Sequence, residues 1–287
     1  MIDCDAFLAH GFVRVRGIPA DRVAACHEVL LDAATAGRRP GSPVARLRWP
    51  RTSLFRGVAT SPALTAAYDE LIGAGRWTPP DLTGGTLVAR FPSDAAPSDA
   101  GWHIEGNWSN GTEYCTNVHS DGRGLFALFL FSDVTLDDAP MGMLPGSHLL
   151  VPDVLAPHGR AGLGGNALVR SMDPRVLCRQ ASYATGEAGD VYLCHPFLIH
   201  TGTWPHRGQA VRLAANLKIE AEGGFVLDGS DPSLVARAIV AGLSTAQIRY
   251  AVNARQLLGP AHQGDTPGSP VVPGPTPEDR AAPPSWR

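Results

Sequence analysis

Two short motifs in the sequence pair a histidine with a carboxylate two residues later. The first joins His103 to Glu105, and the second joins His119 to Asp121. On a β-strand, residues two apart point to the same face, so either pair offers an imidazole and a carboxylate to one space. With 10 histidines and 27 acidic residues in the chain, roughly one or two such motifs are expected by chance. Spacing alone does not choose between them.

A later stretch, residues 189–220, supplies two further chemical groups. It is typical of two short strands joined by a turn, with His200 at the far end of the first strand and Arg212 inside the second. In residues 210–219 the side chains alternate between a packing face and a polar face. The polar face would carry Arg212, Ala214, Asn216 and Lys218. An arginine fixed on the inner face of a sheet needs an anion to pair with.

These groups together predict a metal site. One histidine, one carboxylate and a second histidine from a distant strand form the two-histidine-one-carboxylate triad, which leaves three positions of an Fe(II) ion open on one side. Nitrogen and oxygen donors without thiolate suit ferrous iron, and the open positions suit oxygen chemistry. His200 would be the distant ligand, with either of the two motifs supplying the other two.

The elements that must position these residues begin with a mostly helical region. A strand over residues 12–16 precedes a helix that Asp21 would cap. The apolar side of that helix would carry Val23, Cys26, Leu30 and Ala33. Residues 38–56 are rich in Arg, Pro and Gly, and they predict a loop. A second helix would begin at Ser61 and end near Gly73.

From residue 85 onward the pattern changes to strands divided by Gly, Asn, Asp and Pro. The clearest strands are expected at residues 86–91, 102–107, 125–134, 189–200 and 210–219. Residues 125–131 are apolar at every position, as expected of a strand covered on both faces. Helices followed by a strand-rich region predict an α+β chain with an antiparallel sandwich or jelly roll at its core.

We expect one domain over residues 1–258, with a β core at about 85–220 and helices at 231–243 and 245–258. Residues 259–287 are rich in Pro, Gly and Ser and are predicted to be a disordered tail.

Composition narrows the classes of function. A chain of 287 residues that is 44% hydrophobic can bury a full core. The net charge of −3 gives no general basic surface for nucleic acid. No apolar run reaches about 20 residues, so no membrane span is expected, and the first residues lack the pattern of a secretory signal. Five scattered cysteines without a C-x-x-C motif favour a reduced, cytoplasmic protein.

Over residues 7–219 the chain resembles the phytanoyl-CoA dioxygenase family of iron(II)- and 2-oxoglutarate-dependent oxygenases. Residues 102–106, WHIEG, are similar to the family's W-H-x-D-G iron motif. The Pro-Gly-Ser-His ending at residues 145–148 and the segment GDVYLCHPFLIH at 189–200 resemble two later motifs. Arg212 stands where the family places the arginine that binds its co-substrate. The order and spacing of these motifs carry the resemblance.

The resemblance implies a double-stranded β-helix, a cupin-like jelly roll with N-terminal and flanking helices. It also implies that His103, Glu105 and His200 are the iron ligands, with His119 and Asp121 as the alternative pair. Glu105 stands where the family usually has Asp, and it still offers one oxygen donor. A carboxylate at this position speaks against halogenation, because related halogenases leave that position to chloride.

The activity implied by the resemblance is oxidation of a small organic molecule with Fe(II), 2-oxoglutarate and O2, with release of succinate and CO2. Hydroxylation is the expected outcome. Arg212 would pair with the distal carboxylate of 2-oxoglutarate, and Thr203 or Thr201 would donate a hydroxyl group to it. Arg207, in an adjacent turn, is a less favoured rival of Arg212.

Aromatic and amide residues near the expected ligands suit a pocket for a flat or ring-containing substrate, although ordinary packing explains them equally well. They are Trp102, Asn107, Trp108, Tyr114 and Trp204. Two other functions share the same sequence features. One is a metal-dependent enzyme that uses the triad without 2-oxoglutarate, such as a zinc hydrolase, and the other is a non-catalytic jelly-roll binding protein.

Overall fold

The computed structural model describes residues 2–16, 18–80, 85–97 and 100–243. Helix α1 (Cys4–His10) leads into strand β1 (Phe12–Val15), which is followed by helix α2 (Ala20–Gly37). The expected cap of α2 is wrong, because Pro19 occupies the cap position and Asp21 lies in the first turn. Its buried residues are Val23, Cys26, Leu30 and Ala34. The last of these replaces Ala33, which is exposed.

The loop predicted over residues 38–56 is the largest error in the helical region. It contains strand β2 (Val44–Arg48) and the start of helix α3 (Ser53–Ala59). Strand β2 pairs residue by residue with β4 (Thr86–Arg90), which lies far away in the sequence, and this pairing holds an arginine-rich segment in a sheet. Helix α4 (Pro62–Leu71) begins as expected, with the Ser61 side chain accepting a hydrogen bond from the backbone N–H of Leu64.

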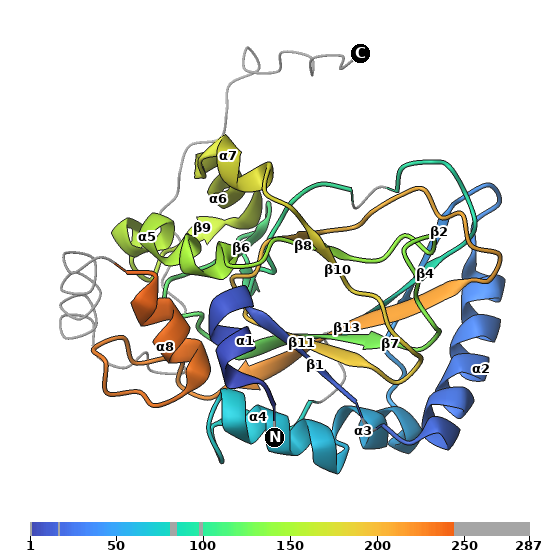
Figure 1. Ribbon diagram of the computed structural model, residues 1–287, viewed down its shortest axis with the longest axis horizontal. Helices are drawn as coiled ribbons and strands as arrows, with labels where there is room; N and C mark the ends of the chain where they lie inside the picture. Colours follow the sequence, from blue (N-terminus) through green and yellow to red (C-terminus); the bar gives the residue numbers. More distant parts are fainter. Residues whose placement is uncertain (1, 17, 81–84, 98–99, 244–287) are drawn as a thin grey trace.

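One large antiparallel sheet organises the molecule. Its strand order is β1-β11-β7-β13-β4-β2, with β3 paired to the end of β13. The strands not yet given are β3 (Trp77–Thr78), β7 (Leu125–Leu130), β11 (Val191–Cys194) and β13 (Arg212–Ala221). Figure 1 shows α2, α3 and α4 along one side of this sheet, with β8 and β10 on its other side.

Strand β13 has the alternation predicted for it. Leu213, Leu217 and Ile219 belong to the main hydrophobic core, together with buried residues of α2, α3 and α4. Ala214 points to the opposite face and joins a second apolar cluster with Phe126 of β7. The strand therefore separates two layers, one packed against helices and one facing the smaller sheet.

The smaller sheet has the order β10-β8-β12 and lies across the second apolar cluster. Its strands are β8 (Gly142–Met143), β10 (Ser182–Tyr183) and β12 (His200–Thr201). A third sheet consists of β5 (Trp108–Ser109), β6 (Tyr114–Thr116) and β9 (Leu163–Gly164). The single strand predicted over residues 189–200 is thus two strands in two sheets, since β11 lies in the large sheet and β12 in the small one.

The expected strand over residues 102–107 is also absent. Only His103 forms a ladder contact, an isolated bridge to His200. The local alternation nevertheless holds, because Ile104 is buried in the main core between the partly exposed His103 and Glu105.

The remaining helices flank the sheets. They are α5 (Val151–Leu155), α6 (Gly165–Ser171), α7 (Pro174–Leu177), α8 (Leu234–Ala241) and the 3-10 turns η1 (Ser147–Leu149) and η2 (Ala156–His158). Helix α8 corresponds to the helix expected at residues 231–243, whereas the helix expected at 245–258 and the tail lie outside the described residues. Among the described helices, none is long and apolar enough to cross a membrane.

Candidate metal centre

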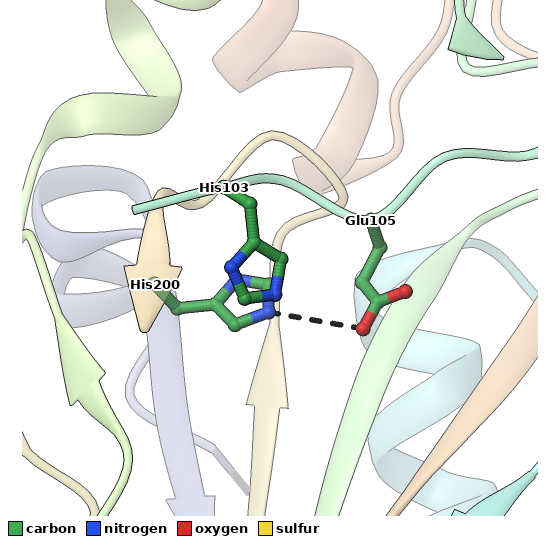
Figure 2. Close-up of side chains that lie close together, drawn as sticks. All are labelled: His103, Glu105 and His200. Atoms are coloured by element: carbon green, nitrogen blue, oxygen red, sulfur yellow. Dashed lines mark ion pairs between the residues drawn. The ribbon is translucent and has the colours of Figure 1, made fainter. Parts of the chain in front are cut away.

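His103, Glu105 and His200 converge on one point, as Figure 2 shows. Each offers one ligand atom, and these atoms all lie within 4.8 Å of one another. Two backbone hydrogen bonds of 2.9 Å, one in each direction between His103 and His200, tie the two distant segments together. Within the part of the chain that the structure describes, this is the one cluster of such residues that can hold a metal ion.

Backbone carbonyl groups fix the orientation of both imidazole rings. His103 Nδ1 lies 2.8 Å from the Gly101 oxygen, and His200 Nδ1 lies 3.0 Å from the Leu198 oxygen. With Nδ1–H donating to a carbonyl, Nε2 of each ring would offer its lone pair to a bound metal, and each ring directs Nε2 toward the centre. The ring of Phe126 stacks on His200 at 4.9 Å between centroids and further restricts its rotation.

Three side chains hold the carboxylate of Glu105 in place. Its Oε1 accepts a hydrogen bond of 3.1 Å from Asn216 and lies 3.7 Å from His200 Nε2. Its Oε2 lies 3.9 Å from Arg123, a buried guanidinium that also donates to the Gly106 carbonyl at 2.8 Å. Burial raises the pKa of Glu105, but the nearby His200 and Arg123 outweigh burial and lower this pKa to about 2. The group is therefore ionised at neutral pH, as a metal ligand must be.

The donor set fits a divalent metal of the ferrous type. It consists of two imidazole nitrogens and one carboxylate, without a thiolate, and all three groups have a supporting hydrogen bond. Supporting hydrogen bonds of this kind are the usual companions of metal ligands.

The alternative pair lies elsewhere. His119 is buried, and its Nδ1 is 3.2 Å from the Phe225 carbonyl oxygen. Asp121 pairs with Arg160 at 2.7 Å and accepts a hydrogen bond from Asn117 at 2.8 Å. Both residues have these other partners, and neither belongs to the cluster of His103, Glu105 and His200.

The triad opens into a cavity of about 270 Å³, which we call the inner cavity. Arg212 lines it, is only 6% exposed, and donates a 2.6 Å hydrogen bond to the Ala139 carbonyl. Two further arginines, Arg46 and Arg90, line the same cavity. Arg90 was not expected at the site from the sequence. The sequence does offer a clue to its position: in the strand expected over residues 86–91, Arg90 lies four residues after Thr86, so both side chains point to the same face.

Thr203 does not reach the inner cavity. Its hydroxyl group donates to the Pro140 carbonyl, and of the two threonines considered for this role, Thr201 and Thr203, only Thr201 lines the cavity. The expected role of Thr203 in co-substrate binding is therefore not supported by its position. Arg207 is exposed and also lies outside this cavity.

A larger opening of about 730 Å³, the outer pocket, meets the inner cavity at His103 and Glu105. Three of the five residues expected to bind substrate line it, namely Trp102, Asn107 and Tyr114.

The other two expected residues do not line the outer pocket. Trp108, on β5, is not among the residues around it. Trp204 is half exposed and lines a neighbouring groove of about 680 Å³ that also includes Trp102 and Tyr183.

No family model matches the chain, and no curated protein matches it. Solved structures that are similar to it include alpha-ketoglutarate-dependent enzymes, and the chain shares their mixed helix and antiparallel-sheet fold. The finer identification with the phytanoyl-CoA dioxygenase family stays a prediction, as does the description as a double-stranded β-helix.

Three solved structures illustrate the likeness. The non-haem alpha-ketoglutarate-dependent carbocyclase SnoK from nogalamycin biosynthesis has a TM-score of 0.56 at 19% identity, over 79% of this chain and 87% of SnoK. The epimerase SnoN, in complex with Fe3+, alpha-ketoglutarate and nogalamycin RO, has a TM-score of 0.53 at 19% identity, over 77% and 83%. EctD from S. alaskensis, with bound Fe, has a TM-score of 0.51 at 16% identity, over 76% and 75%.

Proposed function

We propose that this protein is a non-haem Fe(II)- and 2-oxoglutarate-dependent oxygenase that oxidises a small organic molecule. The observation that carries the proposal is the combination of the His103–Glu105–His200 cluster with a buried arginine, Arg212, around one inner cavity. Iron and alpha-ketoglutarate bound to SnoN, on the same fold, support it. On this chain, the His–Glu–His cluster would match the iron, and Arg212 would match the 2-oxoglutarate.

His103 and His200 would hold the metal through Nε2, and Glu105 would hold it through one carboxylate oxygen. The carbonyls of Gly101 and Leu198 keep the two rings aimed at the centre before any metal arrives. Bound iron and 2-oxoglutarate supply the oxidising chemistry, with O2 consumed and succinate and CO2 released. The protein's residues contribute position and charge.

Arg212 would pair with the distal carboxylate of 2-oxoglutarate. Its burial excludes water, which strengthens a guanidinium–carboxylate contact. The hydrogen bond to the Ala139 carbonyl fixes one edge of the guanidinium.

The outer pocket would hold the substrate, because it meets the metal ligands directly and has a volume suited to a small organic molecule. Trp102 and Tyr114 offer aromatic surface, while Asn107 and Lys218 offer hydrogen bonds. Hydroxylation is the proposed outcome. SnoK and SnoN are a carbocyclase and an epimerase, so analysis of the oxidised product is needed to test this part. The resemblance to phytanoyl-CoA dioxygenases does not make an acyl-CoA the substrate.

Anaerobic titration tests the proposal. We expect a visible charge-transfer band when the protein, Fe(II) and 2-oxoglutarate are all present, followed on admission of O2 by conversion of 2-oxoglutarate to succinate. A zinc hydrolase with the same donor set would bind metal without responding to 2-oxoglutarate, and a non-catalytic binding protein would take up no iron. Either result would contradict the proposed function.

A further inference from the structure

Arg90 stands directly beside Arg212 on the neighbouring strand. The register of β13 with β4 places Arg212 opposite Arg90, and the Cβ atoms of such pairs lie about 4.5–5.5 Å apart. Both side chains are buried, at 6% and 4% exposure, and both line the inner cavity. The two guanidinium groups therefore enter the cavity from the same row of the sheet.

The same register gives the inner cavity two chemically different ends. Asn216, which binds Glu105, is opposite Thr86 and marks the metal end. Arg212 and Arg90 are four residues away along their strands, about 13 Å at roughly 3.3 Å per residue. Long arginine side chains cover part of that distance. The cavity thus runs from a metal-binding end to an end with two cations.

A 2-oxoacid with a second carboxylate matches this arrangement. Its keto-acid end belongs at the metal, so its distal carboxylate must lie toward the arginines. A carboxylate has two oxygens and about four acceptor positions, enough for two guanidinium groups at once. Two like charges placed opposite each other on a sheet repel, and a carboxylate between them replaces that repulsion by two attractions.

We propose that Arg90 and Arg212 jointly bind the distal carboxylate of 2-oxoglutarate, and that Arg90 makes the site specific for a diacid. This inference rests on the proposed function and adds a residue to it. Arg46, which also lines the cavity, is registered opposite Val88, one row nearer the metal end, and is exposed. We therefore assign to Arg90, and not to Arg46, the role of binding the distal carboxylate together with Arg212.

The test compares two ligands that differ only at the distal end. 2-Oxopentanoate has the same five-carbon chain and the same keto-acid group as 2-oxoglutarate, but it lacks the second carboxylate. Dissociation constants for both are measured by anaerobic calorimetry on the Fe(II)-loaded protein. We expect Arg90→Gln to weaken 2-oxoglutarate binding roughly tenfold or more, as loss of a charged hydrogen bond does, and to change 2-oxopentanoate binding less than about twofold.

Arg207→Gln is the matched control, because Arg207 is an exposed arginine outside the inner cavity, and both affinities should stay unchanged. Equal weakening of both ligands by Arg90→Gln would mean that Arg90 only maintains the cavity, and unchanged 2-oxoglutarate affinity would mean that it makes no contact. Either result overturns the inference while leaving the proposed function intact.

A second variant keeps the inference testable if Arg90→Gln does not fold. In Arg212→Gln, Arg90 would still recognise the distal carboxylate, so a preference of about tenfold for 2-oxoglutarate over 2-oxopentanoate should remain. Complete loss of that preference would overturn the role of Arg90. If the wild-type protein binds Fe(II) but shows no preference between the two oxoacids, the proposed function fails together with the inference.

Discussion

The histidines near the core of this protein have different chemical roles that their hydrogen bonds distinguish. His195 uses both ring nitrogens in the core, since Nδ1 accepts from the Phe197 N–H and Nε2 lies 3.3 Å from the Val235 carbonyl. His103 and His200 instead bind a carbonyl through Nδ1 and direct Nε2 to a shared centre with Glu105. Residue type alone does not separate these roles. The surroundings of the other ring nitrogen do, because it contacts the core in His195 and faces the shared centre in His103 and His200.

At the residue scale, we predict that His103→Ala and His200→Ala each abolish stoichiometric iron binding, because each removes one of the three proposed ligands. His119→Ala is the comparison, and it should leave iron binding largely intact, since His119 contacts the Phe225 carbonyl away from the centre. Iron content after anaerobic reconstitution is the measurement, on protein whose circular dichroism shows a native fold. Loss of iron from the His119 variant alone would transfer the ligand role to the second motif.

At the scale of elements, the site depends on β13 pairing with two neighbours at once. Its residues 214–219 pair with β7, and 212–216 pair with β4. This double pairing fixes Arg212 and Asn216 at the two ends of the inner cavity. The bridge between His103 and His200 then brings the proposed metal ligands over the same face.

A partly buried ion pair anchors the segment that leads into helix α8. Arg76 donates to both carboxylate oxygens of Asp231, at 2.6 and 2.7 Å. Asp231 also accepts hydrogen bonds from the backbone N–H groups of Val226 and Ser233. Burial raises the pKa of Asp231, but Arg76 and Ser233 outweigh it and lower this pKa to about 2. The carboxylate therefore stays charged and needs its partner.

At the element scale, we predict that Arg76→Ala lowers the free energy of unfolding by about 2 kcal/mol, because it leaves a buried carboxylate without its cation. This is less than the loss for a fully buried pair, since the Arg76 side chain is 32% exposed. Urea unfolding measures the change. Arg175→Ala is the matched control, since the Arg175–Asp173 pair is equally short at 2.6 Å but lies at the surface. Equal effects of the two variants would contradict the role of burial.

At the scale of the whole molecule, a main hydrophobic core lies between the helices and the large sheet, and a second apolar cluster lies between the two sheets. The ring centroids of two buried histidines, His148 and His195, lie 5.0 Å apart, and the ring of Phe7 on helix α1 packs against His195. Burial lowers the pKa of His148 to about 4, and it lowers the pKa of His195 well below the usual value. Both are neutral in the folded protein, and protonation of either favours unfolding.

We therefore predict a stability of the whole fold that declines in mild acid. Between the pKa of an unfolded histidine, 6.5, and the folded value of about 4 for His148, the unfolded chain binds more protons. Stability is thus fully present above about pH 6.5 and falls as the pH drops toward 4, by about 3 kcal/mol from His148 alone. Urea unfolding across this range measures it. His148→Gln, which cannot become charged, should give a flatter profile, and an unchanged profile would contradict the assignment.

Local patterns in the sequence determined several elements. The alternation of β13, the fully apolar run of β7 and the Ser-Pro start of α4 depend on neighbours within a few residues, so they could be predicted without the fold. The triad residues could be proposed because their types and order resemble known motifs. Their convergence is consistent with that proposal, although the metal ligands themselves stay a prediction.

Only the tertiary structure decided which distant segments meet. The segment predicted as one strand over residues 189–200 crosses from one sheet to another, and an arginine-rich loop became β2 because β4 pairs with it. The places of Arg90 beside Arg212 and of Arg123 beside Glu105 follow from such pairings and contacts. Hydrogen bonds between strands far apart in the chain set these positions, and no short stretch of sequence contains the register that joins them.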